Sequence, residues 1–301
     1  MSTLFSHFFE KINEIRPLES NFTEVLASIA LMPEILYFYG KIPENVVKTV
    51  AIVGSRRNTK YGEEIAYKMS YELAKRGVVI VSGLAFGIDS IAHRAALDAG
   101  GTTVAILGTP IDEIYPRAHL PLAKEIIEKG GMIMSEYSPK SRCYPKSTSF
   151  LQRNRIISGL SDAVVVVEAA ERSGSLNTAS HALEQGKEIF AVPGNITNPY
   201  SMGCNKLIKQ GATPYTELDD ILRVLFPEQF LKKYSKKSQP LLFGDTEEET
   251  KILQSLADGL RNGEEIIAKT NLSTGVFNET ITLLEIKGLV QSLGANNWML
   301  A

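Results

Sequence analysis

The chain has 301 residues, and at roughly 150 residues per domain this length predicts about two domains. Hydrophobic residues make up 44% and charged residues 22%, and 32 Lys and Arg against 34 Asp and Glu give a net charge of −2, so a polyelectrolyte is excluded and any nucleic-acid site must be a local patch. The two cysteines, Cys143 and Cys204, are too few for a disulfide framework or a zinc-ligand set, and we expect neither a metal nor a cofactor.

The N-terminal segment, residues 1–45, carries apolar residues at helical spacing, including the Pro-bounded stretch MPEILYFYGKIP. We predict short helices that pack on an edge of a sheet. The opening sequence MSTLFSHFFEKINEIR interrupts its apolar residues with His7, Glu10 and Lys11, and the chain has no run of about 18 apolar residues. We therefore expect a cytoplasmic protein that does not enter a membrane.

Residues 46–226 alternate short apolar runs with amphipathic stretches of helical length, a pattern typical of βα units in a parallel sheet. The best helix candidate is Tyr61–Arg76, with Ile65, Met69 and Leu73 on one face and Gly77 as its stop signal. The sequence predicts an α/β domain with a doubly wound, mostly parallel sheet, whose six strands begin at Thr49, Val78, Thr103, Met132, Asp162 and Glu188.

Two more regions follow this domain. Residues 227–245 contain four lysines and little periodicity, which predicts an exposed linker. Residues 246–301 have the element order of a winged helix. The expected helices are Glu247–Ala257, Gly263–Lys269 and Ser273–Ile286, and the sequence GLVQSLGANNWMLA predicts two strands around a turn.

Small residues and arginines follow several of the predicted strands. The first strand ends in Gly54-Ser55-Arg56-Arg57, the second in Ser82-Gly83, and the fifth leads to Arg172-Ser173-Gly174-Ser175. Ligands of open α/β sheets bind beyond the carboxyl ends of the strands, and free backbone N–H groups at helix N-termini favour anions. A glycine at such a place also serves a tight turn. Their recurrence on one edge nevertheless favours a phosphate-binding face.

An enzyme is the less favoured interpretation. The sequence has neither G-x-x-x-x-G-K-[ST] nor G-x-G-x-x-G, and Glu136, Glu168 and Asp89 lie in three segments where each suits a helix cap or an Arg partner, so we assign them no catalytic role. The alternative is a nucleoside-monophosphate phosphoribohydrolase on a related fold, which uses P-G-G-x-G-T-x-x-E. The nearest segments here, RSGSLNTASHA and VPGNIT, lack the required Glu.

The most basic segment runs from Ser138 to Ile157 and contains Lys140, Arg142, Lys146, Arg153 and Arg155 without an acid. Tyr137, Tyr144 and Phe150 are interleaved with these cations. Cations that follow phosphates and aromatic rings that stack on bases suit a single strand of nucleic acid. We predict an exposed basic loop that binds such a strand; the alternative is a solvated loop with Phe150 anchored in the core.

Several motifs resemble the DNA processing protein A family (DprA, also called Smf): GSR, SGLAFGIDSIAHRAAL, EIYP, FLQRNRIISGLSDAVVVVEA, RSGSLNTA, FAVPG and GCNKLIKQGA. The resemblance implies an extended Rossmann-like domain that binds single-stranded DNA, protects incoming DNA and hands it to the recombinase RecA in natural transformation. It also implies a homodimer. The DNA-binding residues that it implies, together with the neighbouring turns, are Gly54, Ser55, Arg56, Ser82, Gly83, Arg117, Lys146, Phe150, Arg153, Arg155, Gly174 and Ser175.

The implied dimer contact falls on CNKLIKQGATPY, with Cys204, Leu207, Ile208 and Ala212 as candidate interface residues. The alternative is that Leu207 and Ile208 form the buried face of a helix on the sheet.

The predicted winged helix is a poor candidate for a duplex-DNA reader. From Thr246 to Ala301 there are four basic and eight acidic residues, and the expected recognition helix Ser273–Ile286 contains no Lys or Arg. Phosphate neutralisation supplies most non-specific DNA affinity. We expect a protein-interaction module or a structural appendage.

Overall fold

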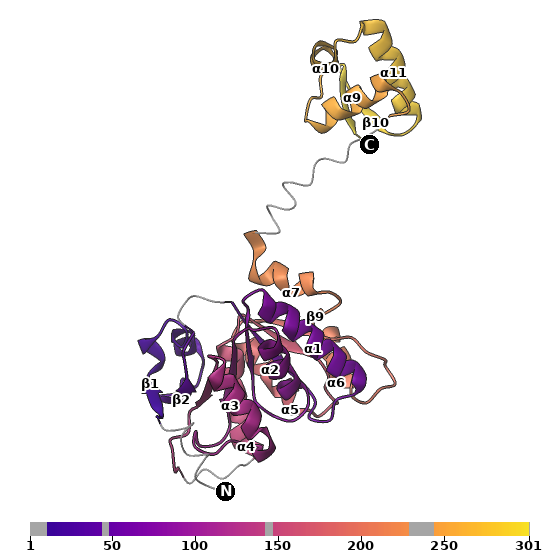
Figure 1. The fold of residues 1–301 in the computed structure, drawn as a ribbon. Coiled ribbons are helices and arrows are strands. Elements are labelled where there is room, and N and C mark those ends of the chain that lie inside the picture. The colour runs from indigo at the N-terminus through magenta and orange to yellow at the C-terminus, as the bar shows by residue number, and fades with distance from the viewer. Residues whose placement is uncertain (1–10, 44–47, 142–146, 229–243, 301) are drawn as a thin grey trace. The chain divides into compact units, whose positions relative to one another are not determined.

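The computed structural model describes residues 11–43, 48–141, 147–228 and 244–300, shown in Figure 1. The chain divides into two compact units, residues 1–227 and 228–301. The predicted linker lies largely outside the described residues.

The first unit is built on a nine-stranded sheet in the order β1-β2-β6-β5-β4-β3-β7-β8-β9. The strands from β6 to β9 in this order are parallel, whereas β1 and β2 join one edge antiparallel. The strands are β1 (Asn13–Ile15), β2 (Leu36–Gly40), β3 (Thr49–Val53), β4 (Val79–Ser82), β5 (Thr103–Leu107), β6 (Met132–Ser135), β7 (Ala163–Val166), β8 (Glu188–Ala191) and β9 (Thr213–Pro214). The six predicted strands and the doubly wound sheet are thus confirmed.

Both faces of this sheet are covered, as its near-continuous apolar strands require. In β3, Val50 and Ile52 face one layer, and Ala51 and Val53 face the other. The first layer consists of α1 (Lys60–Lys75), α2 (Ile88–Asp98), α3 (Leu120–Glu128) and α7 (Leu218–Leu225). The second consists of α4 (Ser147–Gly159), α5 (Gly174–Glu184) and α6 (Met202–Lys209). Helix α1 ends as predicted, before Gly77 at φ +79°.

The helical prediction for the N-terminal segment is wrong in its main feature. Residues Leu36–Gly40 form β2, which pairs with β6, and Asn13–Ile15 form β1 beside it. Between them lie only two short 3₁₀ helices, Pro17–Glu19 and Glu24–Ser28. The aromatic run Leu-Tyr-Phe-Tyr has high strand propensity, and pairing on an open sheet edge outweighs the helical spacing of its neighbours.

The second unit has the predicted winged-helix order. Its elements are α9 (Glu247–Ala257), α10 (Gly263–Thr270), α11 (Thr274–Ile286), β10 (Val290–Gly294) and β11 (Asn297–Leu300). Eight buried hydrophobic residues form a core of its own, with Phe277 and Leu284 of α11 at 0% exposure. This packing confirms the three helices and the hairpin.

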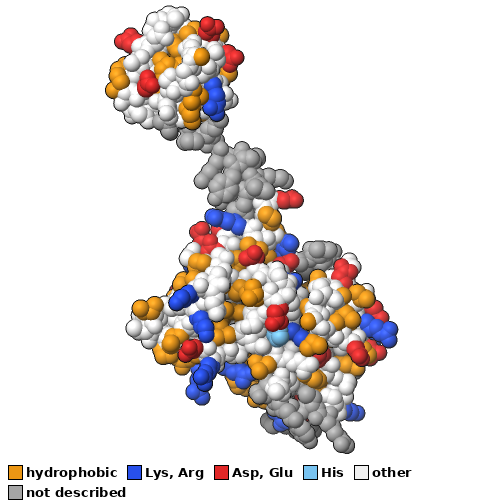
Figure 2. Space-filling model, turned by 180° about the vertical axis from the view of Figure 1, so that it is seen from behind, with side chains coloured by type: hydrophobic (Ala, Val, Ile, Leu, Met, Phe, Trp, Pro, Cys, Tyr) orange, Lys and Arg blue, Asp and Glu red, His pale blue; other side chains and the backbone are white. Residues whose placement is uncertain are grey.

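The surface carries charges of both signs. Figure 2 shows Lys and Arg side chains interspersed with Asp and Glu over the face of the first unit that it presents. Within the described residues no helix combines the length and the hydrophobicity that a membrane span needs. Because charges of both signs are interspersed on the face in view, a charged binding site on this unit would be local.

Candidate functional site

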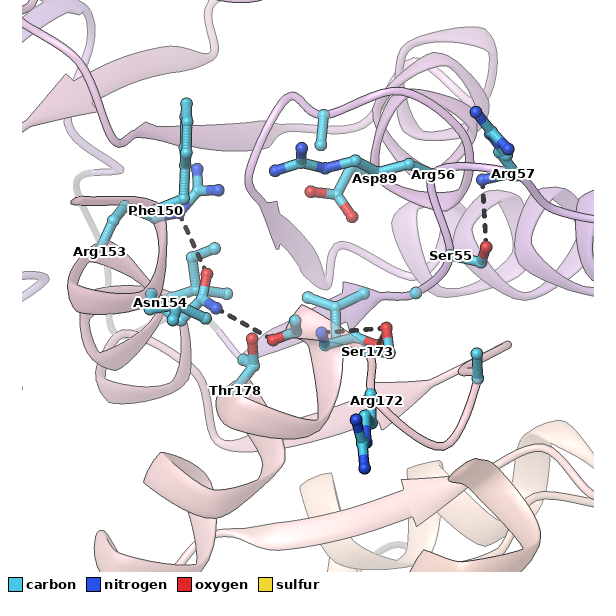
Figure 3. A pocket seen from close by; sticks show the side chains of 18 of the residues that line it. Ser55, Arg56, Arg57, Asp89, Phe150, Arg153, Asn154, Arg172, Ser173 and Thr178 are labelled. Carbon is cyan, nitrogen blue, oxygen red and sulfur yellow. Dashed lines mark hydrogen bonds between the residues drawn. The ribbon is translucent and has the colours of Figure 1, made fainter. Parts of the chain in front are cut away.

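The strand order determines where a cleft opens. From β3 the chain proceeds to β4, β5 and β6 on one side, whereas β7 and β8 lie on the other side of β3. The segments after β3 and β7 therefore diverge, and such a switch point is where open α/β sheets bind ligands. A cleft of about 720 Å³ lies there. It is lined mainly from three segments: residues 53–57 after β3, residues 170–178 around the start of α5, and residues 150–157 of α4; Ala85, Asp89 and Tyr200 complete the lining (Figure 3).

The turn after β3 presents two exposed arginines, Arg56 and Arg57. The hydroxyl oxygen of Ser55 accepts a hydrogen bond from the Arg57 backbone N–H at 3.1 Å, which folds the turn back on itself. Gly54 has no room for a side chain, because a Cβ there would lie 2.6 Å from the side chain of Ile88. The tight turn thus brings backbone and guanidinium groups close to the cleft.

The opposite wall is the start of α5, an 11-residue helix. Ser173 is its N-cap, and its hydroxyl accepts a hydrogen bond from the Ser175 N–H at 3.4 Å. Arg172 precedes the cap and is exposed. The partial positive charge of a helix N-terminus adds to that of a neighbouring arginine, and together they favour an anion at this wall.

The third wall, from α4, contributes an aromatic ring. The guanidinium carbon of Arg56 lies 5.4 Å from the centre of the Phe150 ring, a cation–π distance. The Tyr115 ring centre lies 5.4 Å from that of Phe150. Gly108 permits this packing, because a Cβ there would lie 2.7 Å from the Phe150 ring. Phe150 is half-buried, so the ring is held in place while part of it remains open.

Arg153 lies on the same helix but is only 4% exposed. Its Nη1 donates to the carbonyl oxygens of Gly83, at 2.8 Å, and of Ile106. Burial lowers the pKa of Arg153 to about 10, and the nearby Asp89 carboxyl opposes that shift. Burial likewise raises the pKa of Asp89, opposed first by Arg153. The Arg153 guanidinium thus donates hydrogen bonds to backbone carbonyls of its own chain.

Arg155 does not reach the cleft. Its guanidinium forms two hydrogen bonds with the Glu136 carboxylate, at 2.9 and 2.6 Å, and its Nε donates to the Leu31 carbonyl at 2.8 Å. Both side chains of the pair are largely buried. The prediction of an exposed basic loop is therefore wrong from Ser147 onward, since this part is helix α4 and buries Arg153 and Arg155. Lys146 lies outside the described residues.

Most of the predicted DNA-binding residues lie in or beside the cleft. Gly54, Ser55, Arg56, Phe150, Arg153, Gly174 and Ser175 line the cleft, and Gly83 lines a smaller cavity beside it. Ser82 is fully buried and donates to the Ile52 carbonyl at 2.6 Å, so it joins two strands. Arg117 is exposed in a short 3₁₀ helix directly after Pro116 of the smaller cavity.

The predicted dimer residues lie on and just after α6. Cys204 is fully buried, and its Sγ lies 3.5 Å from the Val166 carbonyl oxygen, so this side chain cannot reach a partner and is removed from the candidate interface. Burial raises the pKa of its thiol to about 12. Leu207, Ile208 and Ala212 are half-buried against the core and stay candidates.

The acidic residues near the cleft have structural partners. Glu168 accepts from the Thr59 N–H at 2.8 Å and from its hydroxyl at 2.6 Å, at the start of α1. Asp89 accepts from the Gly83 N–H at 3.1 Å, and Glu136 holds Arg155. Within the described part of the chain, no group of three or more His, Cys, Asp or Glu residues is placed to hold a metal.

Sequence reasoning missed two aromatic residues beside the cleft, Phe86 and Tyr115, which line the smaller cavity with Arg56 and Phe150. A signal was present for Phe86, because it stands in the Gly83–Gly87 turn, between a strand and a helix, where no core is expected. Arg57 and Arg172, which the sequence places after strands but which are not among the predicted DNA-binding residues, also line the cleft.

The chain combines a Rossmann-like domain, with an arginine-lined cleft at its switch point, and a winged helix, and both units match models of DNA-processing recombination mediators. The chain belongs to the DNA recombination-mediator protein A family, whose model matches residues 13–226, and residues 236–296 match the DprA winged helix domain.

Similar proteins come from several bacteria. Protein Smf of Escherichia coli is 49% identical over 193 residues, or 64% of this chain, and the match spans about half (51%) of that relative's length. The DNA processing protein DprA of Bacillus subtilis is 41% identical over 72% of each chain. DNA processing protein A structures from Streptococcus pneumoniae and Helicobacter pylori have TM-scores of 0.65 and 0.62, at 40% and 30% identity, covering 72% and 74% of this chain and 75% and 97% of theirs.

Proposed function

We propose that this protein binds single-stranded DNA in the cleft, without a cofactor and without catalysing a reaction, and that it protects the strand and loads the recombinase RecA on it in natural transformation and recombination. The observation that carries the proposal is the placement of Arg56 over the Phe150 ring at the switch point, 5.4 Å from its centre. One cation and one aromatic ring at the same place suit one phosphate and one base.

The composition of the walls supports a strand without sequence preference. Arg56, Arg57 and Arg172 are exposed, and the α5 N-terminus adds a further anion-binding element. Because phosphates carry no sequence information and every base has a stacking face, such a surface binds single strands broadly. The DNA processing protein A of Helicobacter pylori binds single-stranded DNA, which further supports the proposal.

The direct test is a fluorescence-anisotropy titration with labelled oligothymidine. Arg56→Ala should weaken binding at low salt, because it removes a phosphate partner and the cation over Phe150. Arg76→Ala is the matched control, since this exposed arginine lies at the C-terminal end of α1, outside the cleft lining, and pairs with Glu72. Wild-type protein that fails to bind oligothymidine contradicts the proposal.

The rival function, hydrolysis of nucleoside monophosphates, lacks support from the acids near the cleft. Glu168 holds the start of α1, and Asp89 and Glu136 have the partners described above. A general acid or base needs access to its substrate, and Asp89, which alone of the three lines the cleft, is only 6% exposed and accepts from the Gly83 N–H. Incubation with nucleoside monophosphates should release no free base, and release that is lost on mutating a cleft residue would favour the enzyme.

A further inference from the structure

A group of exposed aromatic side chains lies immediately beside the cleft. Phe86, in the turn after β4, is 48% exposed, and Tyr115, in the segment after β5, is 43% exposed. Both line the smaller cavity, of about 30 Å³, together with Arg56 and Phe150 of the cleft. Two large rings exposed at one place, next to a charged cleft, need an explanation beyond the core, since neither is buried by the protein itself.

The turn that carries Phe86 is held firmly. Leu84 has φ +58° and is fully buried, and His119 Nδ1 lies 2.8 Å from its carbonyl oxygen. Gly87 has φ +77°, and a Cβ there would lie 2.3 Å from the Ser55 carbonyl oxygen, so the turn packs directly against the turn that carries Arg56. The Phe86 ring meets the His119 ring edge to face at 4.7 Å. Phe86 is therefore displayed by a constrained backbone.

Tyr115 extends the aromatic surface in continuity with the cleft. Its ring centre lies 5.4 Å from that of Phe150, which in turn lies under Arg56. Arg117, two residues further on, is exposed. Arg56, Phe150 and Tyr115 thus form a continuous row, and the exposed Arg117 follows Tyr115 closely in the chain, so that cations for phosphates and rings for bases are present in the same region.

We propose that Phe86 and Tyr115 form a second base-stacking surface, which extends the path of single-stranded DNA out of the cleft, with Arg117 beside it for a phosphate. This proposal rests on the proposed function. Single-stranded DNA is favoured over a protein partner because the rings lie beside Arg56 and adjoin the cleft, and because the exposed Arg117 follows Tyr115 by two residues. Rings presented on a rigid turn bind a base without a large loss of side-chain entropy.

The test compares intact oligothymidine with oligothymidines that lack the base at one position, scanned along the strand. For the wild type, one or more positions contacting this surface should show about tenfold weaker binding when the base is removed, since a stacked base contributes about 1–3 kcal/mol and 1.4 kcal/mol corresponds to tenfold. Phe86→Ala and Tyr115→Ala should weaken binding of the intact strand by about the same factor and should make those positions insensitive to base removal.

Two variants separate stacking from a structural effect. Phe86→Trp should keep both the affinity and the sensitivity to base removal, because it retains a stacking face. Tyr67→Ala is the matched control for loss of an exposed aromatic, since Tyr67 is 39% exposed on α1 and stacks on Tyr71, outside both cavities. It should bind like the wild type.

The outcomes distinguish this proposal from the proposed function. Wild-type protein without affinity for any oligothymidine contradicts the proposed function itself. If the wild type binds but Phe86→Ala and Tyr115→Ala bind equally well, or lose affinity equally for intact and abasic strands, the stacking surface is overturned while the cleft remains. Normal single-strand binding by both variants combined with loss of recombinase loading would assign the surface to a protein partner instead.

Discussion

Arg153 Nη1 donates a 2.8 Å hydrogen bond to the carbonyl oxygen of Gly83, while the Gly83 N–H donates at 3.1 Å to Asp89. One peptide segment is therefore held from both sides, by a cation of α4 and by an anion of α2. No side chain fits between them, because a Cβ on Gly83 would lie 2.6 Å from the Arg153 guanidinium. This contact joins the helix that carries Phe150 to the turn that carries Phe86.

Arg153→Ala should therefore reduce stability rather than remove a phosphate contact. It leaves the buried Asp89 without its nearby cation and two carbonyls without a donor, and we expect the free energy of unfolding to fall by about 3 kcal/mol. Arg56→Ala, on the exposed turn, should change it by less than about 0.5 kcal/mol. Urea unfolding of both variants measures the difference. Coincident curves for Arg153→Ala and wild type would remove the structural role.

The salt dependence of DNA binding should report the exposed arginines only. Among the described residues, four exposed arginines lie in or beside the cleft: Arg56, Arg57, Arg117 and Arg172. At about −0.7 per phosphate on single strands, four contacts give a slope of log K against log salt of roughly −2.8, and Arg56→Ala should make it shallower by about 0.7. Anisotropy titrations at several salt concentrations test this. A slope that Arg56→Ala leaves unchanged would exclude a phosphate contact at this residue.

The position of the cleft was predictable because it depends on strand order and on the strand ends, and both leave clear marks in the sequence. Gly54-Ser55-Arg56 and Ser173-Gly174-Ser175 follow apolar runs, and the parallel sheet brings them to one edge. The burial of Arg153 was not predictable in the same way. Helix α4 has polar residues on its buried side, so its sequence lacks the periodicity by which a helix is recognised.

Edge strands and exposed rings were harder to predict for a different reason. Strand β2 owes its conformation to pairing with β6, a contact about a hundred residues away along the chain, and local spacing does not record it. Phe86 and Tyr115 belong to different turns, and only the folded structure brings both to one cavity.

His93 should make the first unit sensitive to acid. It is fully buried, and burial lowers its pKa to about 3, with His119 as a further cause. The folded protein keeps His93 neutral while the unfolded chain protonates it near its ordinary value of 6.5, so stability is lost as the pH falls from about 6.5 toward 3, by up to about 1.4 kcal/mol per pH unit. His93→Gln should flatten this dependence in urea unfolding between pH 7 and 5. Parallel pH profiles for the two proteins would contradict it.

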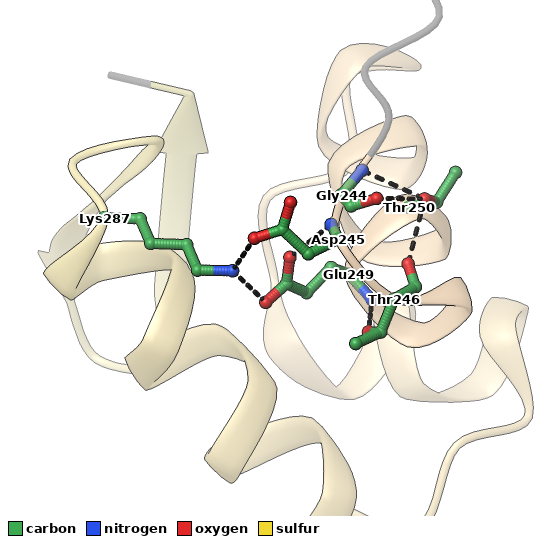
Figure 4. Close-up of polar contacts among 6 residues, drawn as sticks. All are labelled: Gly244, Asp245, Thr246, Glu249, Thr250 and Lys287. Carbon is green, nitrogen blue, oxygen red and sulfur yellow. Dashed lines mark hydrogen bonds and ion pairs between the residues drawn. The ribbon is translucent and has the colours of Figure 1, made fainter.

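The second unit should be dispensable for single-strand binding. It has its own core. Ion pairs within the unit hold the residues at its N-terminal end, because Lys287 pairs with Asp245 at 2.8 Å and with the buried Glu249 at 2.6 Å, as Figure 4 shows. Its acidic charge balance does not favour phosphates. A protein ending at Pro227 should fold and bind oligothymidine within about twofold of the full chain, a change of about 0.4 kcal/mol. A folded truncated protein that fails to bind would place a DNA contact in the second unit.

The assembly prediction concerns α6. Leu207 and Ile208 are half-buried against the core of their own chain, and two apolar residues earlier in the chain, Ile196 in the segment before α6 and Met202 at its start, are 83% and 44% exposed. A homodimer that covers this surface would carry two clefts, and one strand that engages both would bind with greater avidity, provided that their spacing allows it.

Light scattering should then give a molar mass about twice 33.1 kDa at micromolar concentration. Ile208→Asp should give a folded monomer. Compared with wild type, this variant should lose affinity for long strands, which can engage two clefts, and should keep its affinity for short strands. Leu183→Asp, at a 72% exposed position on α5, is the control for adding an exposed charge and should leave the dimer intact. Wild-type protein that is monomeric and binds long strands with full affinity would exclude both the dimer and the avidity.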